Sequence, residues 1–480
     1  MIQFLLNNRL VTETALDPNM TVLNYLRSHQ QRRGTKEGCA SGDCGACTVT
    51  LGKVVAGRMQ YQAINSCLTL VSSIQGKQLI TVEDLKQGRE LHSVQQAMVD
   101  CHGSQCGYCT PGFVMSLFTL QKNTQGWNQQ QAEHALAGNL CRCTGYRPIM
   151  AAAQQACAQP LEDNFVADEP ALVQRLQALN NREVQMLEAN GSRCFIPKTL
   201  AQLAALYQQY PEARLLAGGT ELTLQITQQY QRLPLLIALE QVKALCTCTE
   251  DEQEIHLGAA APLHHCYHFM AAKIPAFSAT LERFASLQIR NQGTLGGNIG
   301  NASPIGDCAP MLLALNARLV LQQGESTREV PLDQFFTGYR QTLLRAGEFI
   351  RTIVIPKVTV SPDFMAWKVA KRLDDDISAV FIAINIQLKD GVVVQARLAF
   401  GGMAATPKRA SAAEDVLIGQ PLNQTTIEQA CAALSQDFQP LSDFRASADY
   451  RLQVARNLLR RYYAQTCGEL TITEVARYVS

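Results

Sequence analysis

Three cysteines fall within one stretch of the chain, Gly38-Cys39-Ala40-Ser41-Gly42-Asp43-Cys44-Gly45-Ala46-Cys47, and Cys67 follows it. This is a Cys-x4-Cys-x2-Cys run with a distant fourth cysteine, which is the plant-type spacing for a 2Fe–2S cluster. Glycine adopts positive φ without strain, so the glycines allow a tight loop that turns backbone N–H groups toward sulfur. The spacing predicts that Cys39, Cys44, Cys47 and Cys67 bind one cluster.

A second group of cysteines lies further along the chain. Cys106 and Cys109 are followed by the Cys-x-Cys pair Cys141 and Cys143. Cys101 also forms Cys-x4-Cys-x2-Cys with Cys106 and Cys109, so spacing alone allows it as a ligand. Because the Cys-x-Cys pair already completes four thiolates, we interpret Cys101 as surplus and the other four cysteines as the ligands of a second cluster.

Structural zinc and disulfides are the alternative roles for these cysteines. Structural zinc favours two Cys-x2–4-Cys pairs, which neither group supplies, and disulfides need an oxidising compartment. We therefore favour iron–sulfur clusters. A zinc-stabilised interaction module without a redox role stays as the alternative from another functional class.

Composition bounds the remaining possibilities. A chain of 480 residues predicts three or four domains, and 47% hydrophobic residues predict substantial cores. The net charge of +1 gives no basic surplus for nucleic acid or anionic lipid. The N-terminus lacks the pattern of a signal peptide, and no apolar run is long enough for a transmembrane helix. With 17 cysteines in addition, we expect a cytoplasmic protein with no nucleic-acid or membrane partner.

Three motifs together resemble those of a known family. They are Gly38–Cys47, His102-Gly103-Ser104-Gln105-Cys106-Gly107-Tyr108-Cys109-Thr110-Pro111-Gly112 and Gly138-Asn139-Leu140-Cys141-Arg142-Cys143-Thr144-Gly145-Tyr146-Arg147-Pro148. The chain resembles the molybdenum hydroxylases, most closely the iron–sulfur and flavin subunits of the bacterial xanthine dehydrogenases, over nearly its whole length.

The resemblance implies a multidomain α+β chain. We expect a β-grasp 2Fe–2S ferredoxin domain, a four-helix 2Fe–2S domain, a linker, an FAD domain of the vanillyl-alcohol-oxidase or PCMH type, and a small α+β domain like the C-terminal domain of the CO dehydrogenase flavoprotein. The boundaries that we assign to these five parts are, in order, 1–85, 86–160, 161–190, 191–357 and 358–480.

Local patterns agree with this plan. Strands at Ile2–Leu6 and Arg9–Thr14 flank a two-residue turn, and Thr21 is placed to cap a helix. Short strands at Thr48–Leu51 and Val54–Val55 are expected on either side of a turn at Gly52-Lys53. Residues 86–160 have helical periodicity, and we expect a cluster buried between two helix N-termini, which favour anionic groups.

Two glycine turns stand out in the third part. Gly218-Gly219 follows a strand expected at Arg214–Ala217, and Gly296-Gly297 lies within Gly293–Asn298. Neither matches Gly-x-Gly-x-x-Gly, so a Rossmann fold is not indicated. Their backbones could donate N–H groups to a pyrophosphate, although most such pairs are only turns.

The resemblance makes both turns FAD loops and adds single positions. It implies FAD contacts from the first loop, the second loop and four further residues: Leu215, Leu216, Ala217, Gly218, Gly219, Thr220, Glu221, Leu222; Thr294, Leu295, Gly296, Gly297, Asn298; Phe284, Asp307, Ile350 and Lys368. A cation at Lys368 would stabilise reduced, anionic flavin. Neither loop offers a histidine or tyrosine for a covalent linkage, so we expect FAD to be held non-covalently.

The family's chemistry implies an electron-transfer subunit. Electrons would pass from a molybdenum centre on a partner through the Cys106 cluster and the Cys39 cluster to FAD and then NAD. Because the chain ends at Ser480, we expect molybdopterin on a separate large subunit, in a heterotetramer of two small and two large chains. Tyr339 and Asp375 are the NAD-site candidates, and their loops predict a dehydrogenase with little oxidase activity.

Two enzyme assignments and the roles of two groups of residues remain open. A relative that hydroxylates aldehydes, carbon monoxide or N-heterocycles is the alternative enzyme, but the fusion of iron–sulfur and flavin parts favours xanthine dehydrogenase. For His264, His265 and His268 we expect exposed or packed side chains rather than a metal site, because Cys266 is the only cysteine or carboxylate at matching spacing. We expect buried small hydrophobic roles for the remaining cysteines: Cys157, Cys194, Cys246, Cys248, Cys266, Cys308, Cys431 and Cys467.

Overall fold

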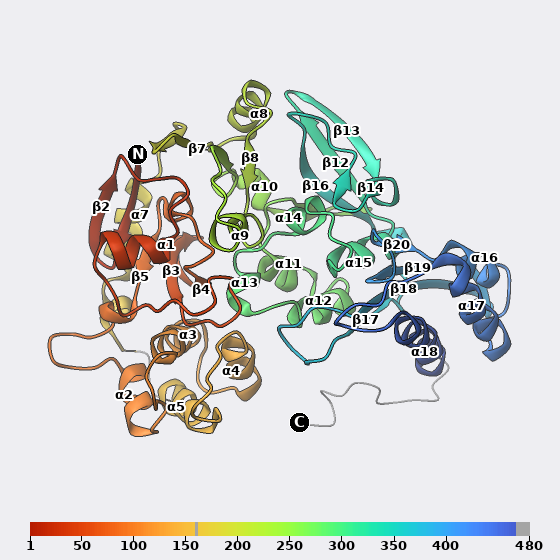
Figure 1. The fold of residues 1–480 in the computed structure, drawn as a ribbon, viewed down its shortest axis with the longest axis horizontal. Coiled ribbons are helices and arrows are strands. Elements are labelled where there is room, and N and C mark those ends of the chain that lie inside the picture. The colour runs from red at the N-terminus through yellow and green to blue at the C-terminus, as the bar shows by residue number, and fades with distance from the viewer. Residues whose placement is uncertain (159–161, 467–480) are drawn as a thin grey trace. The chain divides into compact units, whose positions relative to one another are not determined.

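The computed structural model describes residues 1–158 and 162–466. The chain forms two compact units, each assembled from separate segments (Figure 1). The first contains Met1–Leu245, Pro262–His264 and Ala285–Thr294, and the second contains Cys246–Ala261, His265–Phe284 and the chain from Leu295 onward. The predicted boundary at 160/161 and Cys467 lie outside the described residues.

The first unit opens with a five-stranded mixed sheet in the order β2-β1-β5-β3-β4. The predicted hairpin is confirmed, with Asn7 at φ 52° in its turn. Thr21 caps α1 as predicted by accepting a hydrogen bond from the N–H of Asn24. The elements are β1 (Ile2–Leu6), β2 (Arg9–Glu13), α1 (Val22–Asn24), the π-helix η1 (Tyr25–His29), β3 (Thr48–Val55), β4 (Arg58–Asn65), η2 (Val71–Ile74), β5 (Gln78–Ile80) and η3 (Val82–Asp84).

The turn predicted at Gly52-Lys53 is wrong. Both residues lie inside β3, where Gly52 pairs with Tyr61 of β4 and Gln78 of β5. The chain instead reverses at Ala56 and Gly57, both at positive φ. A glycine within a strand resembles a turn signal in sequence, but two neighbouring strands supply the hydrogen bonds that keep this one extended.

Four helices follow and pack together, as predicted (Figure 1). They are α2 (Ser93–Asp100), α3 (Thr110–Asn123), α4 (Gln129–Leu136) and α5 (Arg147–Ala158). Helix α3 is buried over most of its length, and Phe113 and Phe118 lie fully within the core. This central helix places its N-terminus beside the cysteine loops.

The predicted connector is tied to the helical part by buried charges. It contains α6 (Asn164–Ala167) and α7 (Glu169–Ala178). Asp163 caps α6 and accepts a hydrogen bond from Lys122 Nζ. Its Oδ2 lies 2.9 Å from His92 Nε2. The Lys122 side chain is 1% exposed and lies over the rings of Tyr61, Phe118 and Phe165. Asp163 is therefore the counter-charge of a buried ammonium.

A four-stranded sheet in the order β6-β7-β9-β8 completes the first unit. Its inner residues, including Leu187, Ile196 and Leu236, share one hydrophobic core with Phe4, Tyr25 and other residues of the first sheet. The elements are β6 (Gln185–Ala189), β7 (Ser192–Ile196), α8 (Leu200–Gln209), β8 (Arg214–Leu216), α9 (Leu222–Thr227), β9 (Leu235–Ala238) and, from the returning segment, α13 (Leu287–Arg290).

The second unit begins with a five-stranded sheet in the order β10-β11-β16-β12-β13. Its elements are α10 (Lys243–Cys246, at the junction), β10 (Cys248–Glu250), β11 (Glu254–Gly258), α11 (Leu263–Met270), α12 (Pro275–Glu282), α14 (Leu295–Gly300), α15 (Cys308–Ala314), β12 (Arg318–Gln323), β13 (Ser326–Pro331), η4 (Leu332–Gln334), β14 (Phe336–Gly338), β15 (Gln341–Thr342), β16 (Phe349–Pro356) and η5 (Lys357–Thr359).

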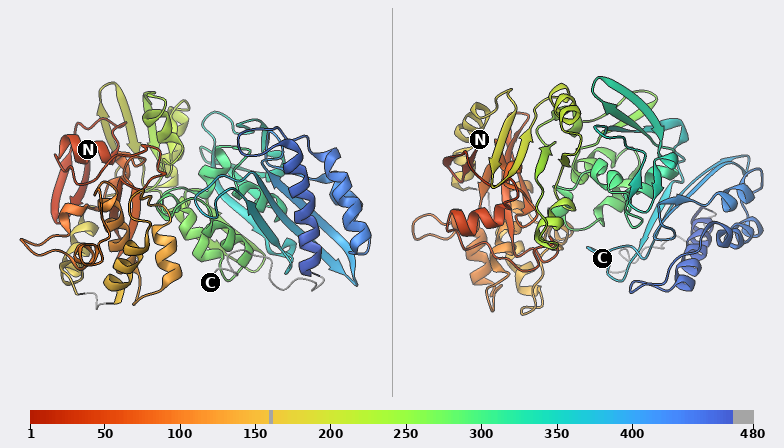
Figure 2. Two further views of the ribbon diagram at one scale, coloured as in Figure 1. Left: turned by 60° about the horizontal axis from the view of Figure 1, so that its bottom comes forward. Right: turned by 45° about the horizontal axis from the view of Figure 1, so that its top comes forward.

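The last part of the second unit is a sheet in the order β17-β18-β19-β20. The blue helices of Figure 2 lie along one face of it and share its core. This arrangement of strands and helices agrees with the small α+β domain that the family resemblance implies. The elements are β17 (Met365–Val369), β18 (Val380–Lys389), β19 (Val392–Gly401), β20 (Lys408–Arg409), α16 (Ser411–Leu417), α17 (Gln424–Asp437) and α18 (Ala448–Thr466).

Asp163 should make a large contribution to the stability of the first unit. Burial raises the pKa of Asp163, but the bonds from His92 and Lys122 outweigh it and lower the pKa to about 2, from 3.8. A depressed carboxyl pKa stabilises the fold above the unfolded value, so this contribution should be lost as the pH falls from about 4 toward 2.

Replacing the carboxylate tests this at neutral pH. Asp163→Asn leaves Lys122 buried without a counter-charge and should lower the free energy of unfolding by about 3–5 kcal/mol. Urea unfolding of a Trp367→Phe background, followed by fluorescence of Trp127, reports on the first unit. Lys122→Met added to Asp163→Asn should restore part of the loss, and equal stability of the single and double variants would contradict the ion-pair explanation.

Candidate functional site

The first cysteine loop surrounds one sulfur with backbone donors. It connects η1 to β3, and the N–H groups of Ser41, Asp43 and Cys44 lie 3.3–3.4 Å from Cys39 Sγ. Such converging amides stabilise a thiolate and the negative charge of a cluster. A hydrogen bond from the Cys44 thiol also lowers the pKa of Cys39, against the opposing effect of burial, to about 4.

The four thiols of this set lie in pairs. Cys47 Sγ is 3.3 Å from Cys67 Sγ, both residues being 2% exposed, and Cys39 is hydrogen-bonded to Cys44. Each iron of a 2Fe–2S core takes two protein thiolates, so two thiol pairs are the ligand arrangement that such a core requires. The residues therefore fit the group that their spacing predicts.

The second set has the same pairing in a more open setting. Hydrogen bonds join Cys106 to Cys143 and Cys109 to Cys141. Cys109 is the N-cap of α3, and the other pair member, Cys141, precedes α5. The prediction of a buried site is wrong here, because Cys106 and Cys143 are exposed. Both lie in loops rather than in the helices that form the core.

Cys101 lies apart from these pairs. It is the C-cap residue of α2, and its thiol donates to Gln155 Oε1 at 3.2 Å. A glutamine partner of its own supports our interpretation of Cys101 as surplus to the second set.

The two cysteine loops touch through their backbones. The N–H of Leu140 donates to the carbonyl of Cys44 at 3.0 Å, and Asn139 Nδ2 donates to the carbonyl of Gly45 at 3.0 Å. A β-carbon on Gly112 would come within 2.2 Å of the same Gly45 oxygen. Sequence analysis assigned no role to Asn139 or Gly112, although both lie in the quoted motifs.

The first glycine loop, Leu215 to Leu222, runs from β8 into α9. Packing alone requires a glycine at position 218, because a β-carbon there would lie 1.8 Å from the Gln292 carbonyl oxygen. Gly219 has φ +76° and packs against the carbonyl of Leu68, which also accepts a hydrogen bond from Thr223. The loop therefore lies against the residue that follows Cys67.

The second glycine loop is divided between the units. Thr294 belongs to the first unit and pairs with Pro262, whereas Leu295 to Asn298 lie on α14 of the second. The N–H of Gly296 donates to the carbonyl of Ala259 at 2.9 Å. Asn298 Oδ1 is buried and accepts no hydrogen bond from the described residues. Such an oxygen suits the hydroxyl or amide donors of a nucleotide cofactor, so this residue fits FAD.

Lys368 and Asp307 form a buried ion pair in the second unit. Lys368 Nζ lies 2.6 Å from Asp307 Oδ2, and Ser378 Oγ donates to Asp307 Oδ1 at 2.6 Å. Both charged side chains are 4% exposed. The family resemblance named the two ends of this pair, whereas Ser378 was missed because it lies far from Asp307 in sequence.

The other expected flavin residues lie on separate elements of this unit. Ile350 is buried on β16, opposite Leu321 of β12, and Phe284 is half-buried in the turn after α12. Arg283, beside Phe284, donates to the carbonyls of Lys368 at 3.4 Å and Leu373 at 2.8 Å. Arg283 therefore holds β17 and the loop after it, and sequence analysis did not find it.

The two NAD-site candidates lie on loops of the second unit. Tyr339 is 62% exposed, in the turn between β14 and β15. Asp375 has φ 49° in the loop after β17, and its carbonyl accepts a hydrogen bond from Arg372 Nη2 at 2.7 Å. Neither placement tests the NAD site, so Tyr339 and Asp375 stay predictions.

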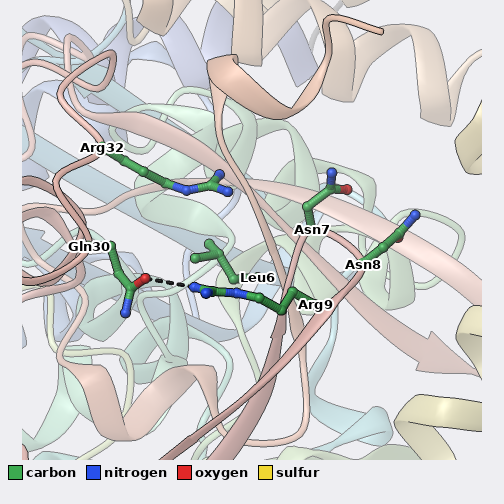
Figure 3. Close-up of a pocket in the computed structure, with 6 residues that line it drawn as sticks. All are labelled: Leu6, Asn7, Asn8, Arg9, Gln30 and Arg32. Carbon is green, nitrogen blue, oxygen red and sulfur yellow. Dashed lines mark hydrogen bonds between the residues drawn. The ribbon is translucent and has the colours of Figure 1, made fainter. Parts of the chain in front are cut away.

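A hollow of about 620 Å³ lies elsewhere, on the edge of the first sheet (Figure 3). Arg9 Nη2 donates to Gln30 Oε1 at 2.8 Å across it. It is lined by Leu6, Asn7, Asn8, Arg9, Gln30 and Arg32, none of which belongs to the cysteine or glycine loops.

Two features are absent from the described residues. In residues 1–158 and 162–466, no three histidine, cysteine, aspartate or glutamate side chains are grouped as ligands of a single metal ion. Within the same ranges, no helix has the length and apolar character needed to cross a membrane.

Six of the seven remaining cysteines that are described are buried, as predicted, and Cys246 is the half-buried exception.

Comparison with known proteins agrees with this geometry. Four family models match consecutive parts of the chain. They are the 2Fe-2S iron-sulfur cluster binding domain (5–72), the [2Fe-2S] binding domain (81–154), the FAD binding domain in molybdopterin dehydrogenase (187–358) and the CO dehydrogenase flavoprotein C-terminal domain (365–466). The chain belongs to the molybdenum hydroxylase family. Within it, this chain carries the iron–sulfur and FAD-binding domains.

Relatives in this family extend well beyond the matched region. Xanthine dehydrogenase of Drosophila subobscura is 34% identical over 98% of this chain and 39% of its own length. Aldehyde oxidase 2 of Mus musculus is 29% identical over 98% of this chain and 39% of its own length. The chain thus spans about two fifths of the length of these curated relatives.

A solved structure shares part of this fold. Reconstituted CO dehydrogenase from Oligotropha carboxidovorans has a chain that is 29% identical, with a TM-score of 0.52. The match covers 55% of this molybdenum hydroxylase chain and 94% of the solved chain.

The cysteine assignments predict distinct effects of two serine variants. The unaltered chain should contain about four irons and little zinc, and Cys141→Ser should retain about two, because one core loses a ligand. Electron paramagnetic resonance should show one signal in place of two. Cys101→Ser is the matched control and should retain both signals, so loss of a cluster in this variant would show that Cys101 is a ligand.

Proposed function

We propose that the chain is the electron-transfer small subunit of a xanthine dehydrogenase. It takes electrons from a molybdenum centre on a partner and delivers them to NAD as hypoxanthine or xanthine is oxidised. The single observation that supports this most strongly is the alignment of 98% of the chain with xanthine dehydrogenase. When bound, 2Fe–2S clusters transfer single electrons, whereas FAD transfers one or two. FAD therefore adapts the one-electron clusters to NAD, which accepts two electrons.

Eight cysteines hold the two clusters in this proposal: Cys39, Cys44, Cys47, Cys67, Cys106, Cys109, Cys141 and Cys143. Their pairing and the N–H groups around Cys39 support the assignment. The N–H of Leu140 on the Cys44 carbonyl keeps the two loops in contact. The polypeptide thereby holds the cysteine ligands in position.

FAD is held non-covalently by the two glycine loops with Phe284, Asp307, Ile350 and Lys368. The buried Asn298 Oδ1, which accepts no hydrogen bond from the described residues, supports this role. Lys368 supplies the cation that favours reduced, anionic flavin, and Asp307 holds its ammonium in one position.

A large molybdopterin-binding subunit is the proposed partner, in a heterotetramer of two small and two large chains. The exposed pair Cys106 and Cys143 supports contact with another chain, because large exposed hydrophobic residues lie close to both cysteines in sequence. Tyr108, Leu140 and Tyr146 are all exposed, and each lies within three residues of Cys106 or Cys143 in the sequence. Such a patch is typical of a protein interface and would exclude water from the cluster on assembly.

A second candidate is the same role in an aldehyde-oxidising relative, which the match to aldehyde oxidase 2 favours. The difference lies in the substrate pocket of the partner.

The decisive experiment uses the complex purified with its partner. It should reduce NAD with xanthine or hypoxanthine and react more slowly with aldehydes and N-heterocycles. Preference for an aldehyde would favour the second candidate. A colourless, zinc-containing chain without flavin absorbance would remove both in favour of an interaction module.

Lys368 should control the flavin. Lys368→Met removes a buried cation and should lower both FAD occupancy and the midpoint potential of the bound flavin, because reduced, anionic flavin loses its counter-charge. Redox titration of the holoprotein measures the potential. Lys368→Arg should retain most of it, and Lys389→Met, an exposed lysine on β18, is the control. An unchanged potential in Lys368→Met would place the cation away from the flavin.

Asp375 should control the use of NAD. We propose that the Asp375 carboxylate favours the cationic nicotinamide and that Tyr339 lies at the face of the nicotinamide ring. This arrangement gives a dehydrogenase with little oxidase activity. A charge-assisted contact of about 1–3 kcal/mol predicts a roughly ten- to hundredfold loss of NAD use in Asp375→Asn. Asparagine tolerates the positive φ of this position.

Kinetics with three acceptors separate this site from the rest of the chain. Turnover with a dye should barely change, since a dye bypasses the nicotinamide site, and oxygen should be measured in parallel. Asp374→Asn is the neighbouring control. If the NAD dependence of Asp375→Asn equals that of the control, Asp375 does not belong to the site.

A further inference from the structure

The segment Ala285–Thr294 carries amide side chains into the iron–sulfur domains. It lies within the region matched by the FAD-binding model, yet it belongs to the first compact unit. Gln288, Asn291 and Gln292 are its three amides, and each is hydrogen-bonded to a residue before position 140. The segment therefore joins parts of the chain that are distant in sequence.

Gln288 lies at the centre of a buried polar network. Its side chain is 0% exposed, and Nε2 lies 2.9 Å from Asn139 Oδ1, 3.2 Å from Ser116 Oγ and 3.4 Å from Thr48 Oγ1. Its three partners come from the loop before Cys141, from α3 and from β3. The other amide atom, Oε1, is bonded to no donor among the described residues.

Asn139 extends this network to the first cysteine loop. Its Nδ2 donates to the carbonyl of Gly45, between Cys44 and Cys47, while its Oδ1 also accepts from Ser116 Oγ at 2.7 Å. Every polar atom of the Asn139 side chain is thus bonded. Gln288 fixes which way this amide faces, because its Nε2 needs an oxygen there.

Gln292 makes a second connection from the same segment. Its Oε1 accepts from the N–H of Asn65 at 3.2 Å, and its Nε2 donates to Thr69 Oγ1 at 2.7 Å. Asn65 Nδ2 in turn donates to the carbonyl of Gly42 at 2.8 Å. The backbone of Gln292 is also the surface against which Gly218 packs.

We propose that Gln288 is a positioning residue that locks the two cysteine loops to each other, with Gln292 tying the same segment to the first glycine loop. A buried network in which the donors of Gln288, Ser116 and Asn139 all find acceptors holds one arrangement of the loops, and a fixed separation of the cofactor loops keeps electron exchange between them efficient. The inference rests on the proposed function for the meaning of those loops, but the locking itself does not require bound cofactors.

Gln288→Met tests this with little change in shape. Methionine matches the length of glutamine and removes the Nε2 donors, while the lost Oε1 made no hydrogen bond with the described residues. Gln121→Met is the matched control. Gln121 is also buried, and its Nε2 donates to the Ala156 carbonyl at 2.8 Å and to Ser93 Oγ at 3.1 Å, away from the cysteine loops.

Hydrogen exchange of the full chain measures the lock without reference to cofactor loading. The N–H of Leu140, bonded to the Cys44 carbonyl, should exchange about tenfold faster or more in Gln288→Met, because the loops open more readily. The control should leave this amide unchanged even where its melting temperature falls. Equal exchange in the two variants, or no change in Gln288→Met, would overturn the proposal.

Electron paramagnetic resonance of the same reduced proteins gives the second readout. Two clusters held at a fixed separation broaden each other's signals, and Gln288→Met should weaken or disperse that broadening while Gln121→Met preserves it. Unaltered broadening in Gln288→Met would also overturn the proposal. A parent protein without iron–sulfur signals would instead contradict the proposed function, and the exchange result would still decide whether Gln288 locks the loops.

Discussion

The carbonyl oxygen of Gly45 lies where the two cysteine loops meet, and it leaves no room for a β-carbon at position 112. It accepts hydrogen bonds from Thr48 Oγ1 at 2.7 Å and Asn139 Nδ2 at 3.0 Å, and a β-carbon on Gly112 would approach it to 2.2 Å. Backbone atoms on both sides cannot move aside as a side chain would. Because Gly112 is in α3 and Asn139 precedes Cys141, this contact fixes both halves of the second cysteine set against the first.

The same restriction appears at the first glycine loop. Gly218 is required because the nearby carbonyl of Gln292 leaves no room for a β-carbon. This packing explains the glycine without a role in phosphate binding. The buried charges obey a related constraint, since Lys122 and Lys368 are each held beside a carboxylate. A buried ammonium without such a partner would cost several kcal/mol. The loops proposed to hold cofactors are thus supported by contacts that the polypeptide makes on its own.

Much of this could be predicted from short-range pattern. The cysteine spacing, the hairpin at Asn7 and the cap at Thr21 are all local features of the chain, and the structure has the hairpin and the cap as expected. The turn at Gly52-Lys53 was wrong because hydrogen bonds from two other strands override the local preference of glycine. Burial of the second cysteine set was predicted only in part, since Cys141 is buried whereas Cys106 and Cys143 are exposed. Their exposure depends on how the helices around them pack.

The sequence by itself determined which residues have the chemistry: two sets of four thiols, two glycine turns and a plan of four domains that the family models match. Only the tertiary structure decided how these parts are held. Gln288 lies 240 residues from Thr48 and 149 from Asn139, yet its amide bonds both. No periodicity or spacing rule relates positions so far apart, because their contact depends on the packing of whole domains. Such contacts follow from the fold as a whole, whereas ligand spacing follows from the geometry of one loop.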